Sequence, residues 1–337
     1  MTENIEVTTC DEFARHGEEI VHAGMEGGVL YACRRAHTWP RVAASLEEFA
    51  EKEKIVAKVN GVVAGRAVLE AVYYPFAELV NMEVAPHFRG RGVGSRLVED
   101  IITRASEMGS LALHLQTDLD NPGAHRLYSR YGFLPARQGQ MLRMIRFLNY
   151  PALDQFLHEH PLALVQSRPA GELWELSWMD HVSDDSLSIH LSGGSCQGDS
   201  NGFGPGVRRF AMRSGSTCLQ ADIRAPDIAD KGEAFDLTVN LTNSGETHLK
   251  GACRLLLNAG CAPRDDTTGL VPLIVNPGSS ETLVLPLVIG ESFYDEPLKR
   301  ICSYPSLPIA AEVILGDRAF WLSSQVRLGQ RSTSASP

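Results

Sequence analysis

The sequence predicts an α/β domain, a mixed sheet with flanking helices, followed by an all-β sandwich domain. Its 337 residues suggest about two domains, and the charged and apolar fractions, 21% and 44%, are ordinary for a globular protein. In residues 1–150, apolar side chains recur with strand spacing and helix spacing in turn. After Tyr150 the helical spacing gives way to short alternating runs separated by Gly, Asn and Pro, which favours a β-sandwich.

The elements expected in residues 1–150 follow the order β-α-α-β-β-β-α-β-α-β. Strands are expected at 4–8, 54–72, 77–85, 111–117 and 141–148, and helices at 11–25, 45–52, 95–109 and 121–132. Asn60-Gly61 divides the run 54–72 into a hairpin, because both residue types accept the positive φ of a tight turn. The succession of strand 77–85, helix and strand 111–117 is a βαβ unit, so part of the sheet should be parallel.

The second half of the chain is expected to be built mainly of strands. Residues 151–219 should hold a short helix at 151–159, strands and a Gly-rich loop that lead into the sandwich or belong to it. The sandwich itself is expected over 220–330, and residues 331–337 have the composition of a disordered tail. The stretch GEAFDLTVNLTNSGETHLKG, together with VNPGSSETLVLPL, resembles immunoglobulin-like sandwich modules in its alternation and its turns.

Charge and composition narrow the function. The chain carries a net charge of −10, and most of this acidity lies after residue 150, so a nucleic-acid partner is not expected. The N-terminal stretch lacks the basic and apolar regions of a secretory signal, and no run of about 18 apolar residues indicates a membrane span. These features predict a cytoplasmic protein.

The cysteines and histidines do not have metal-binding spacing. The seven cysteines are scattered and form no C-x-x-C pair, so they are interpreted as reduced thiols. The two histidines of HEH (158–160) lie two residues apart, on different sides of any helix, so no metal site is predicted there. His181, Asp184, Asp185 and His190 are interpreted as a polar loop that enters a strand.

The stretch RGRGVG at 89–94 is the strongest functional signal, because it joins a predicted strand to a predicted helix. Glycines let several backbone N–H groups converge at a helix N-terminus, where the helix dipole adds positive charge, and such a turn binds phosphate. The Walker pattern is excluded because no lysine follows, and the dinucleotide pattern fails because Leu97 stands where its third glycine would be. The alternative interpretation is a tight, solvated turn without a ligand.

Two motifs carry a resemblance to a known family. VAPHFRGRGVGSRLVE resembles the acyl-CoA loop of the GNAT superfamily of N-acyltransferases, whose pattern [QR]-x-x-G-x-[GA] is filled by Arg89, Gly92 and Gly94. NPGAHRLYSRYGF resembles the second signature of that family, and the matching residues are Asn121, Ala124, Tyr128, Gly132 and Phe133. The resemblance covers residues 4–148 and implies the mixed sheet of this family.

The resemblance also implies a binding site for acyl-CoA as co-substrate, most simply acetyl-CoA. It places the diphosphate on the main-chain amides of Arg89, Gly90, Arg91, Gly92, Val93, Gly94 and Ser95. The pantetheine arm is expected alongside Met82–Val84, where a backbone N–H near Val84 faces the thioester carbonyl. Tyr128 is expected to protonate the leaving thiolate, and Asn121, seven residues before it, should lie on the same side of the helix. Tyr131 could partly substitute for Tyr128.

Glu83 is the best candidate for the base that deprotonates the amine, because its strand neighbours Met82 and Val84 should point to the opposite face. The alternative role for Glu83 is to anchor the acceptor ammonium group. Glu70 and His114 are weaker candidates for the base.

The predicted function is transfer of an acyl group to a primary amine of a small molecule or peptide. The acceptor pocket is expected from the first two helices with residues 32–44, which include Trp39, and from 72–76, which include Tyr73 and Tyr74. Two alternatives stay open: a transferase of this fold that uses aminoacyl-tRNA as donor, and an inactive CoA-binding domain with an interacting sandwich. The sandwich could also form a homodimer.

Overall fold

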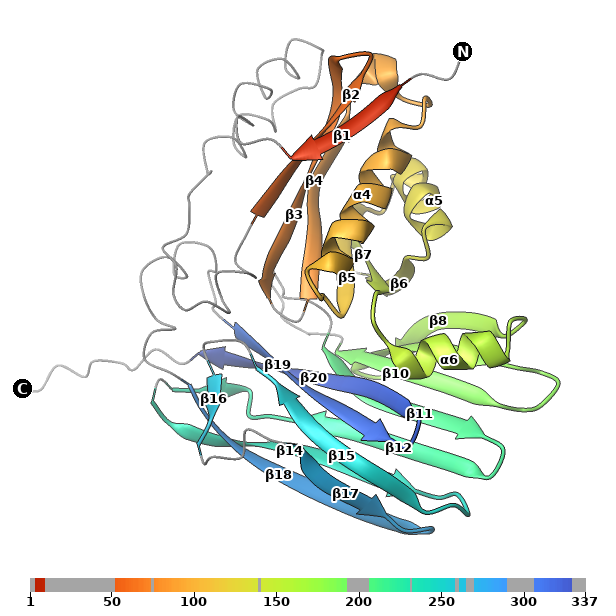
Figure 1. Ribbon diagram of the computed structural model, residues 1–337, viewed down its shortest axis with the longest axis vertical. Helices are drawn as coiled ribbons and strands as arrows, with labels where there is room; N and C mark the ends of the chain where they lie inside the picture. Colours follow the sequence, from red (N-terminus) through yellow and green to blue (C-terminus); the bar gives the residue numbers. More distant parts are fainter. Residues whose placement is uncertain are drawn as a thin grey trace, which may run out of the picture. The chain divides into compact units, whose positions relative to one another are not determined.

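The computed structural model describes residues 4–9, 52–73, 76–138, 141–192, 206–230, 232–257, 261–264, 270–289 and 306–328. The chain divides into two compact units, Met1–Asn149 and Tyr150–Pro337. The first is a mixed sheet with helices, and the second is built mainly of antiparallel strands, so the predicted fold class is confirmed (Figure 1).

The first unit is a seven-stranded sheet of order β1-β2-β3-β4-β5-β7-β6. Its strands are β1 Ile5–Thr9, β2 Lys52–Val59, β3 Val62–Tyr73, β4 Phe76–Val84, β5 Ala112–Asp118, β6 Leu134–Gln138 and β7 Met141–Phe147. Among the described strands of this sheet, only β4 and β5 pair in parallel, as the βαβ prediction requires. The described helices are η1 Pro86–Phe88, α4 Val93–Glu107 and α5 Pro122–Arg130, and α4 and α5 lie beside each other on one face of the sheet (Figure 1).

Local sequence explains the hairpin and the packing of α4. Asn60 and Gly61 have φ of 52° and 82°, so the predicted hairpin between β2 and β3 is confirmed. The apolar face of α4, formed by Val93, Leu97, Val98, Ile101 and Ala105, is buried against the sheet. Gly65 of β3 lets this helix approach closely, because a Cβ there would lie 3.1 Å from Val93 Cγ1 and 3.2 Å from Leu97 Cδ1.

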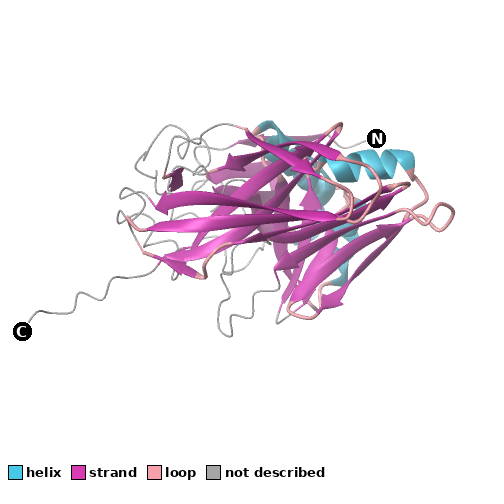
Figure 2. Cartoon of the chain, turned by 90° about the horizontal axis from the view of Figure 1, so that it is seen from below, coloured by secondary structure: helices cyan, strands magenta, loops and turns pink. Residues whose placement is uncertain are grey.

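The second unit contains an eight-stranded and a five-stranded sheet that pack face to face, and Figure 2 shows how strands dominate the chain. The eight-stranded sheet consists, in spatial order, of β16 Cys261–Pro263, β18 Ser279–Ile289, β14 Ala234–Asn243, β12 Thr217–Arg224, β11 Val207–Ser214, β10 Ser186–Ser192, β9 Leu173–Met179 and β8 Leu164–Ala170. The five-stranded sheet consists of β13 Ile228–Ala229, β20 Arg318–Leu328, β19 Ser306–Leu315, β15 Leu249–Leu256 and β17 Val271–Val275.

Aromatic side chains join the two sheets of this unit. Phe210 of β11 stacks on Phe320 of β20, with ring centroids 4.1 Å apart and planes inclined by 13°. Tyr150 is fully buried, and its hydroxyl donates to the carbonyl oxygen of Trp321 at 3.1 Å. The helix α6, Pro151–Glu159, follows directly and matches the helix expected at 151–159.

Several expectations for the second half and for the N-terminal helices now have an outcome. The strands between residues 164 and 224 hydrogen-bond into the same sheet as β14 and β18. The sequence prediction missed β6. The helices expected at 11–25 and 45–52, most of the Gly-rich loop and the tail 331–337 lie outside the described residues, apart from Lys52, which begins β2. The immunoglobulin-like resemblance stays a prediction.

Candidate active site

The strands β4 and β5 part halfway along β4. Their parallel pairing joins Phe76–Leu79 to Ala112–Leu115 and ends at the pair Leu79–Leu115. From Val80 to Val84, the partners of β4 in the described part of the chain all lie in β3. Between the pairs Val68–Val80 and Arg66–Glu83, two residues of β4 oppose one of β3, which is a β-bulge.

This parting leaves an open edge of β4 at Val80–Val84. The amide of Ala85 donates to the carbonyl oxygen of Ala64 at 2.9 Å, so Ala85 directs its polar groups toward β3. Because successive residues of a strand direct their polar groups to opposite sides, those of Val84 point to the open edge. The bulge residue Asn81 has a φ of 51°, which few residue types other than Gly, Asn and Asp accept. The edge can therefore pair with an extended ligand.

The glycine turn leads from this edge into α4. Gly90 and Gly92 have φ of 74° and 87°, and the first intrahelical bond runs from the amide of Arg96 to the carbonyl oxygen of Gly92 at 3.1 Å. The amides of Val93, Gly94 and Ser95 therefore have no acceptor within the helix, as at any helix start. The first turn of α4 contains no acidic residue that would repel an anion. Such an arrangement can bind phosphate oxygens through main-chain N–H groups.

Two arginines of the turn lie on its exposed side. The Nε of Arg89 donates to the carbonyl oxygen of Val84 at 3.1 Å, which places a guanidinium at the open edge of β4. The guanidinium of Arg91 lies over the ring of Phe88, 5.0 Å from its centroid, and its Nη1 is 3.4 Å from the carbonyl oxygen of His87. Both cations are close in sequence to the free helix amides and add positive charge there.

The helix α5 brings the second motif to the same place. Asn121 is its N-cap, and Asn121 Oδ1 accepts a hydrogen bond from the amide of Ala124 at 3.0 Å. The side chain of Leu127 contacts the first turn of α4, since a Cβ on Gly94 would lie 3.3 Å from Leu127 Cδ2. The motif asparagine thus has a structural role in starting the helix, and its role toward a ligand stays a prediction.

Tyr128 of α5, part of the second motif, is buried. It is 6% exposed, its ring lies edge-on to that of Phe133 with centroids 5.7 Å apart, and it shares one hydrophobic cluster with Met82 and Val84 of β4. Burial raises the pKa of the Tyr128 phenol to about 12, so the hydroxyl is protonated at neutral pH and can donate a hydrogen bond. Tyr131 is engaged elsewhere, because its hydroxyl donates to Glu99 Oε1 at 2.8 Å.

Glu83 lies on the other face of β4 from this cluster, as expected from the alternation of the strand. Its Oε2 accepts hydrogen bonds from Nε and Nη2 of Arg66, at 3.1 and 2.9 Å. The side chain of Arg66 is 1% exposed, whereas that of Glu83 is 33% exposed. The carboxylate is thus paired with a guanidinium and partly open to a ligand, and Arg66 is a neighbour that sequence reasoning did not identify.

Of the two weaker candidates for the base, His114 and Glu70, only the side chain of His114 is among the described residues. His114 of β5 is buried, and its Nε2 lies 3.5 Å from Oε2 of its cross-strand neighbour Glu78. The side chains of Glu70, Tyr73 and Tyr74 and the whole of residues 32–44 lie outside the described residues, so the expected acceptor pocket stays a prediction.

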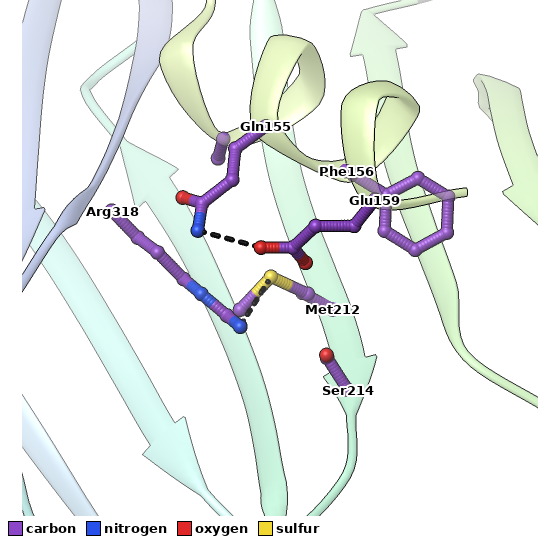
Figure 3. Close-up of a pocket in the computed structure, with 7 residues that line it drawn as sticks. Gln155, Phe156, Glu159, Met212, Ser214 and Arg318 are labelled. Carbon is purple, nitrogen blue, oxygen red and sulfur yellow. Dashed lines mark hydrogen bonds between the residues drawn. The ribbon is translucent and has the colours of Figure 1, made fainter. Parts of the chain in front are cut away.

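In the second unit, polar side chains gather where α6 meets β11 and β20. A shallow hollow there is lined by Ala152, Gln155, Phe156, Glu159, Met212, Ser214 and Arg318 (Figure 3). Its polar atoms bind one another: Gln155 Nε2 donates to Glu159 Oε1 at 2.9 Å, and Arg318 Nη1 lies 3.2 Å from Met212 Sδ.

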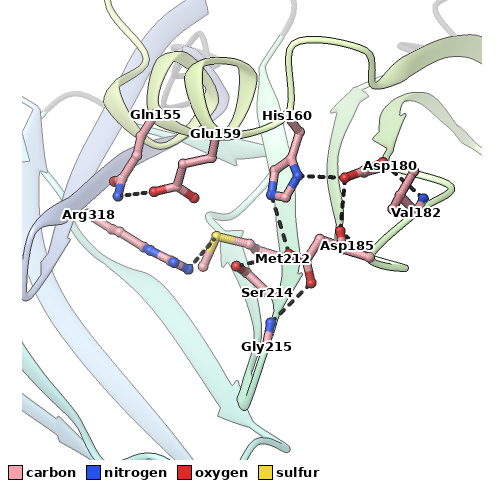
Figure 4. A network of polar contacts seen from close by, with 11 residues as sticks. Gln155, Glu159, His160, Asp180, Val182, Asp185, Met212, Ser214, Gly215 and Arg318 are labelled. Atoms are coloured by element: carbon pink, nitrogen blue, oxygen red, sulfur yellow. Dashed lines mark hydrogen bonds and ion pairs between the residues drawn. The ribbon is translucent and has the colours of Figure 1, made fainter.

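Beside the hollow, His160 lies between two carboxylates (Figure 4). Its Nδ1 is 2.8 Å from Asp180 Oδ2, and its Nε2 is 3.3 Å from Asp185 Oδ2. Asp185 was expected in a polar loop with His181 and Asp184, and it does directly precede β10. The described residues contain no group of three His, Cys, Asp or Glu side chains arranged to hold a metal ion.

None of the helices among the described residues has the length and hydrophobicity needed to cross a bilayer.

Comparison with known proteins finds a family match within the first unit. Residues 29–133 match the family described as Acetyltransferase (GNAT) family. Mycothiol acetyltransferase of Acidothermus cellulolyticus is 44% identical over 92 residues, 26% of this chain and 25% of the relative. An uncharacterised N-acetyltransferase of Methanocaldococcus jannaschii is 39% identical over 57 residues, 17% of this chain and 25% of the relative. The chain thus spans only about a quarter of the length of these curated relatives.

Among solved structures, the chain is similar to the ribosomal-protein-S18-alanine N-acetyltransferase of Escherichia coli. The alignment covers 42% of this chain and 91% of the chain of that enzyme. The sequence identity is 21% and the TM-score is 0.31. From the family match, the chain carries a GNAT acetyltransferase domain over residues 29–133.

Proposed function

We propose that the chain is an N-acyltransferase, most simply an N-acetyltransferase, that moves the acyl group of acyl-CoA to a primary amine. The observation that supports this most is the open edge of β4 at Val80–Val84, which runs into the glycine turn at the start of α4. An extended pantetheine arm would pair with the edge through main-chain hydrogen bonds. The diphosphate would lie on the amides of residues 89–95, with Arg89 and Arg91 beside it.

The reaction would proceed by direct attack in a ternary complex. The amine nitrogen forms a bond to the thioester carbonyl carbon, and the C–S bond breaks. Glu83 accepts the proton that the amine loses, or else anchors the acceptor ammonium group. The Val84 amide at the open edge stabilises the oxyanion, and Tyr128 donates a hydrogen bond to the sulfur that leaves. With a pKa near 12, Tyr128 is a hydrogen-bond donor to the thiolate rather than a strong acid.

The acceptor would be a small-molecule or peptide amine. One relative is named a mycothiol acetyltransferase, which is a reason to test amines that also carry a thiol. The acidic balance of the chain weighs against aminoacyl-tRNA as donor, because phosphate binding depends on basic surface.

The test combines binding and transfer on the full chain. Coenzyme A is titrated calorimetrically, and acetyl-CoA is incubated with a panel of amines, including amino thiols, while mass spectrometry follows free CoA and the acetylated acceptor. Binding with transfer to at least one amine is the expected result. Binding without transfer to any amine would favour an inactive CoA-binding domain, and absence of binding would refute the proposal.

A further inference from the structure

The sequence prediction placed a candidate base on β4 but gave it no partner. The structure supplies one, because Arg66 of β3 lies directly opposite Glu83 in the register of the two strands. We propose that Arg66 is a positioning residue that holds the Glu83 carboxylate at the open edge of β4. The effect of Arg66 on catalysis rests on the proposed acyl transfer, whereas the geometry of the Arg66–Glu83 pair does not.

The two side chains share the face of the sheet opposite α4. The neighbouring cross-strand pair, Gly65 and Val84, is on the α4 side: a Cβ on Gly65 would contact Val93, and Val84 packs on the same cluster. Since successive side chains of a strand point to opposite faces, Arg66 and Glu83 project away from α4. The acid is therefore separated from Tyr128 by the thickness of β4.

The burial of the pair is asymmetric, with its cation enclosed and its anion partly open. Arg66 is 1% exposed and Glu83 33%, whereas both members of the surface pair Arg96–Glu99 are largely exposed, at 55% and 41%. A buried guanidinium is costly unless it is paired, so the hydrogen-bonded carboxylate opposite Arg66 offsets part of that cost.

The hydrogen bonds from Arg66 engage one oxygen of the Glu83 carboxylate and leave the other open. Both Nε and Nη2 of Arg66 donate to the same oxygen, Oε2. Among the described residues, none donates to Glu83 Oε1. A charge-assisted pair of donors on one oxygen fixes the side-chain rotamer, while the other oxygen can meet an amine or an ammonium group.

The bulge determines where this oxygen is presented. The extra residue of β4 between Val80 and Glu83 shifts the register by one, which brings Glu83 rather than Met82 opposite Arg66. The same bulge lies in the part of β4 that pairs with no described residue on the β5 side. The structure therefore places an arginine-held carboxylate beside the strand edge that would carry the thioester.

The test compares three variants by activity. Glu83→Gln removes the charge, Arg66→Met removes the donors but fills the buried site, and Arg66→Lys keeps the charge without the two-pronged geometry. With an amine identified as acceptor, we expect Arg66→Met to lower kcat about 100-fold and Arg66→Lys about 10-fold. The Kd for CoA should be unchanged, because neither residue faces the glycine turn. Arg104→Met, which removes a partner of Asp100 on α4, is the control for loss of an ion pair and should keep kcat.

A second measurement does not depend on activity. Urea unfolding of Arg66→Met, Glu83→Gln and the double variant gives the coupling between the two residues, and the double variant should be destabilised less than the sum of the single ones. If unfolding shows coupling but the wild-type chain transfers no acyl group, the proposed function is refuted and the pairing stands. Coupling together with full kcat in a folded Arg66→Met variant would overturn the positioning role, and additive unfolding effects would overturn the pairing.

Discussion

The Nε of Arg89 donates a hydrogen bond to the carbonyl oxygen of Val84, 3.1 Å away. This bond connects the first residue of the glycine turn to the last residue of β4. The strand edge and the helix N-terminus, which would receive different parts of one long ligand, are thereby fixed relative to each other. The bond also holds the guanidinium at the open edge of β4.

Replacing this arginine should weaken CoA binding through loss of charge. We expect Arg89→Gln to raise the Kd for CoA by roughly tenfold or more, since a hydrogen bond to a charged group contributes about 1.5–3 kcal/mol. The loss should shrink as salt is raised, because the contact is exposed. Arg104→Gln, at the other end of α4, is the control for an equal change in net charge. Calorimetry at low and high ionic strength measures both, and equal affinities for the two variants would contradict the assignment.

Gly92 and Gly109 provide a matched pair at the two ends of α4. Both have positive φ, 87° and 75°, so an alanine at either position should lower the free energy of unfolding by about 1–2 kcal/mol. Only Gly92 lies in the turn whose amides would bind the diphosphate. We therefore expect both variants to unfold at similarly lower urea concentrations, whereas only Gly92→Ala loses CoA affinity in calorimetry. A similar loss in Gly109→Ala would mean that general destabilisation, not the turn, governs binding.

The elements that the sequence predicted correctly are those governed by local rules. The turn at Asn60-Gly61 needs only two residues that accept positive φ, and α4 needs only apolar side chains at helical spacing and Gly109 after its end. The short strand β6, LPARQ, has no alternation and contains a proline, so nothing local distinguishes it from a loop. Its place beside β7 depends on the sheet.

The contacts that the sequence could not predict depend on register and distant pairing. Continuing the pair Val68–Val80 without the bulge would have placed Met82, not Glu83, opposite Arg66. The only local hint of the bulge is Asn81, a residue type that accepts a positive φ but does not require one. His160 likewise meets Asp180 only because α6 and the β9–β10 turn pack together, and no spacing rule links residues 20 apart in this way.

Tyr128 should not control the pH dependence of the reaction below about pH 10. Its pKa is raised from 10.0 to about 12 by burial, so it stays protonated across the usual assay range. We expect Tyr128→Phe to lower kcat about 100-fold and to leave the alkaline limb of kcat/KM at the same pH. Tyr131→Phe, which loses the bond to Glu99, should keep kcat. A limb that disappears in Tyr128→Phe would show that the phenol itself titrates in that range.

The same burial links Tyr128 to stability at high pH. The folded-state pKa lies above the unfolded value, so the contribution of the neutral phenol is complete below pH 10 and is lost as pH rises toward about 12. Unfolding of wild type and Tyr128→Phe, measured at pH 8 and again above about pH 11, should show a smaller difference at the higher pH.

Asp180 in the second unit should stabilise the fold in a pH-dependent way. Its pKa is lowered by the backbone N–H of Val182 first, and then by the hydrogen bond with His160. Because the folded-state pKa lies below the unfolded value of 3.8, this stabilisation is present above about pH 4 and is lost as the pH falls below that value. We expect Asp180→Asn to lower the urea midpoint at pH 7, and the difference from wild type to shrink as the pH falls below about 4.

Asp184→Asn is the matched control for this experiment, because Asp184 is on the same turn and has a φ of 59°, which asparagine also accepts. It should unfold like the wild type at both pH values. Unfolding can be followed by tryptophan fluorescence, since Trp174, Trp178 and Trp321 of the second unit are three of the four tryptophans in the chain. A midpoint difference for Asp180→Asn that is equally large at pH 3 and pH 7 would mean that lost packing, not the ionised carboxylate, explains the effect. In that case His160 would be held by shape rather than by charge.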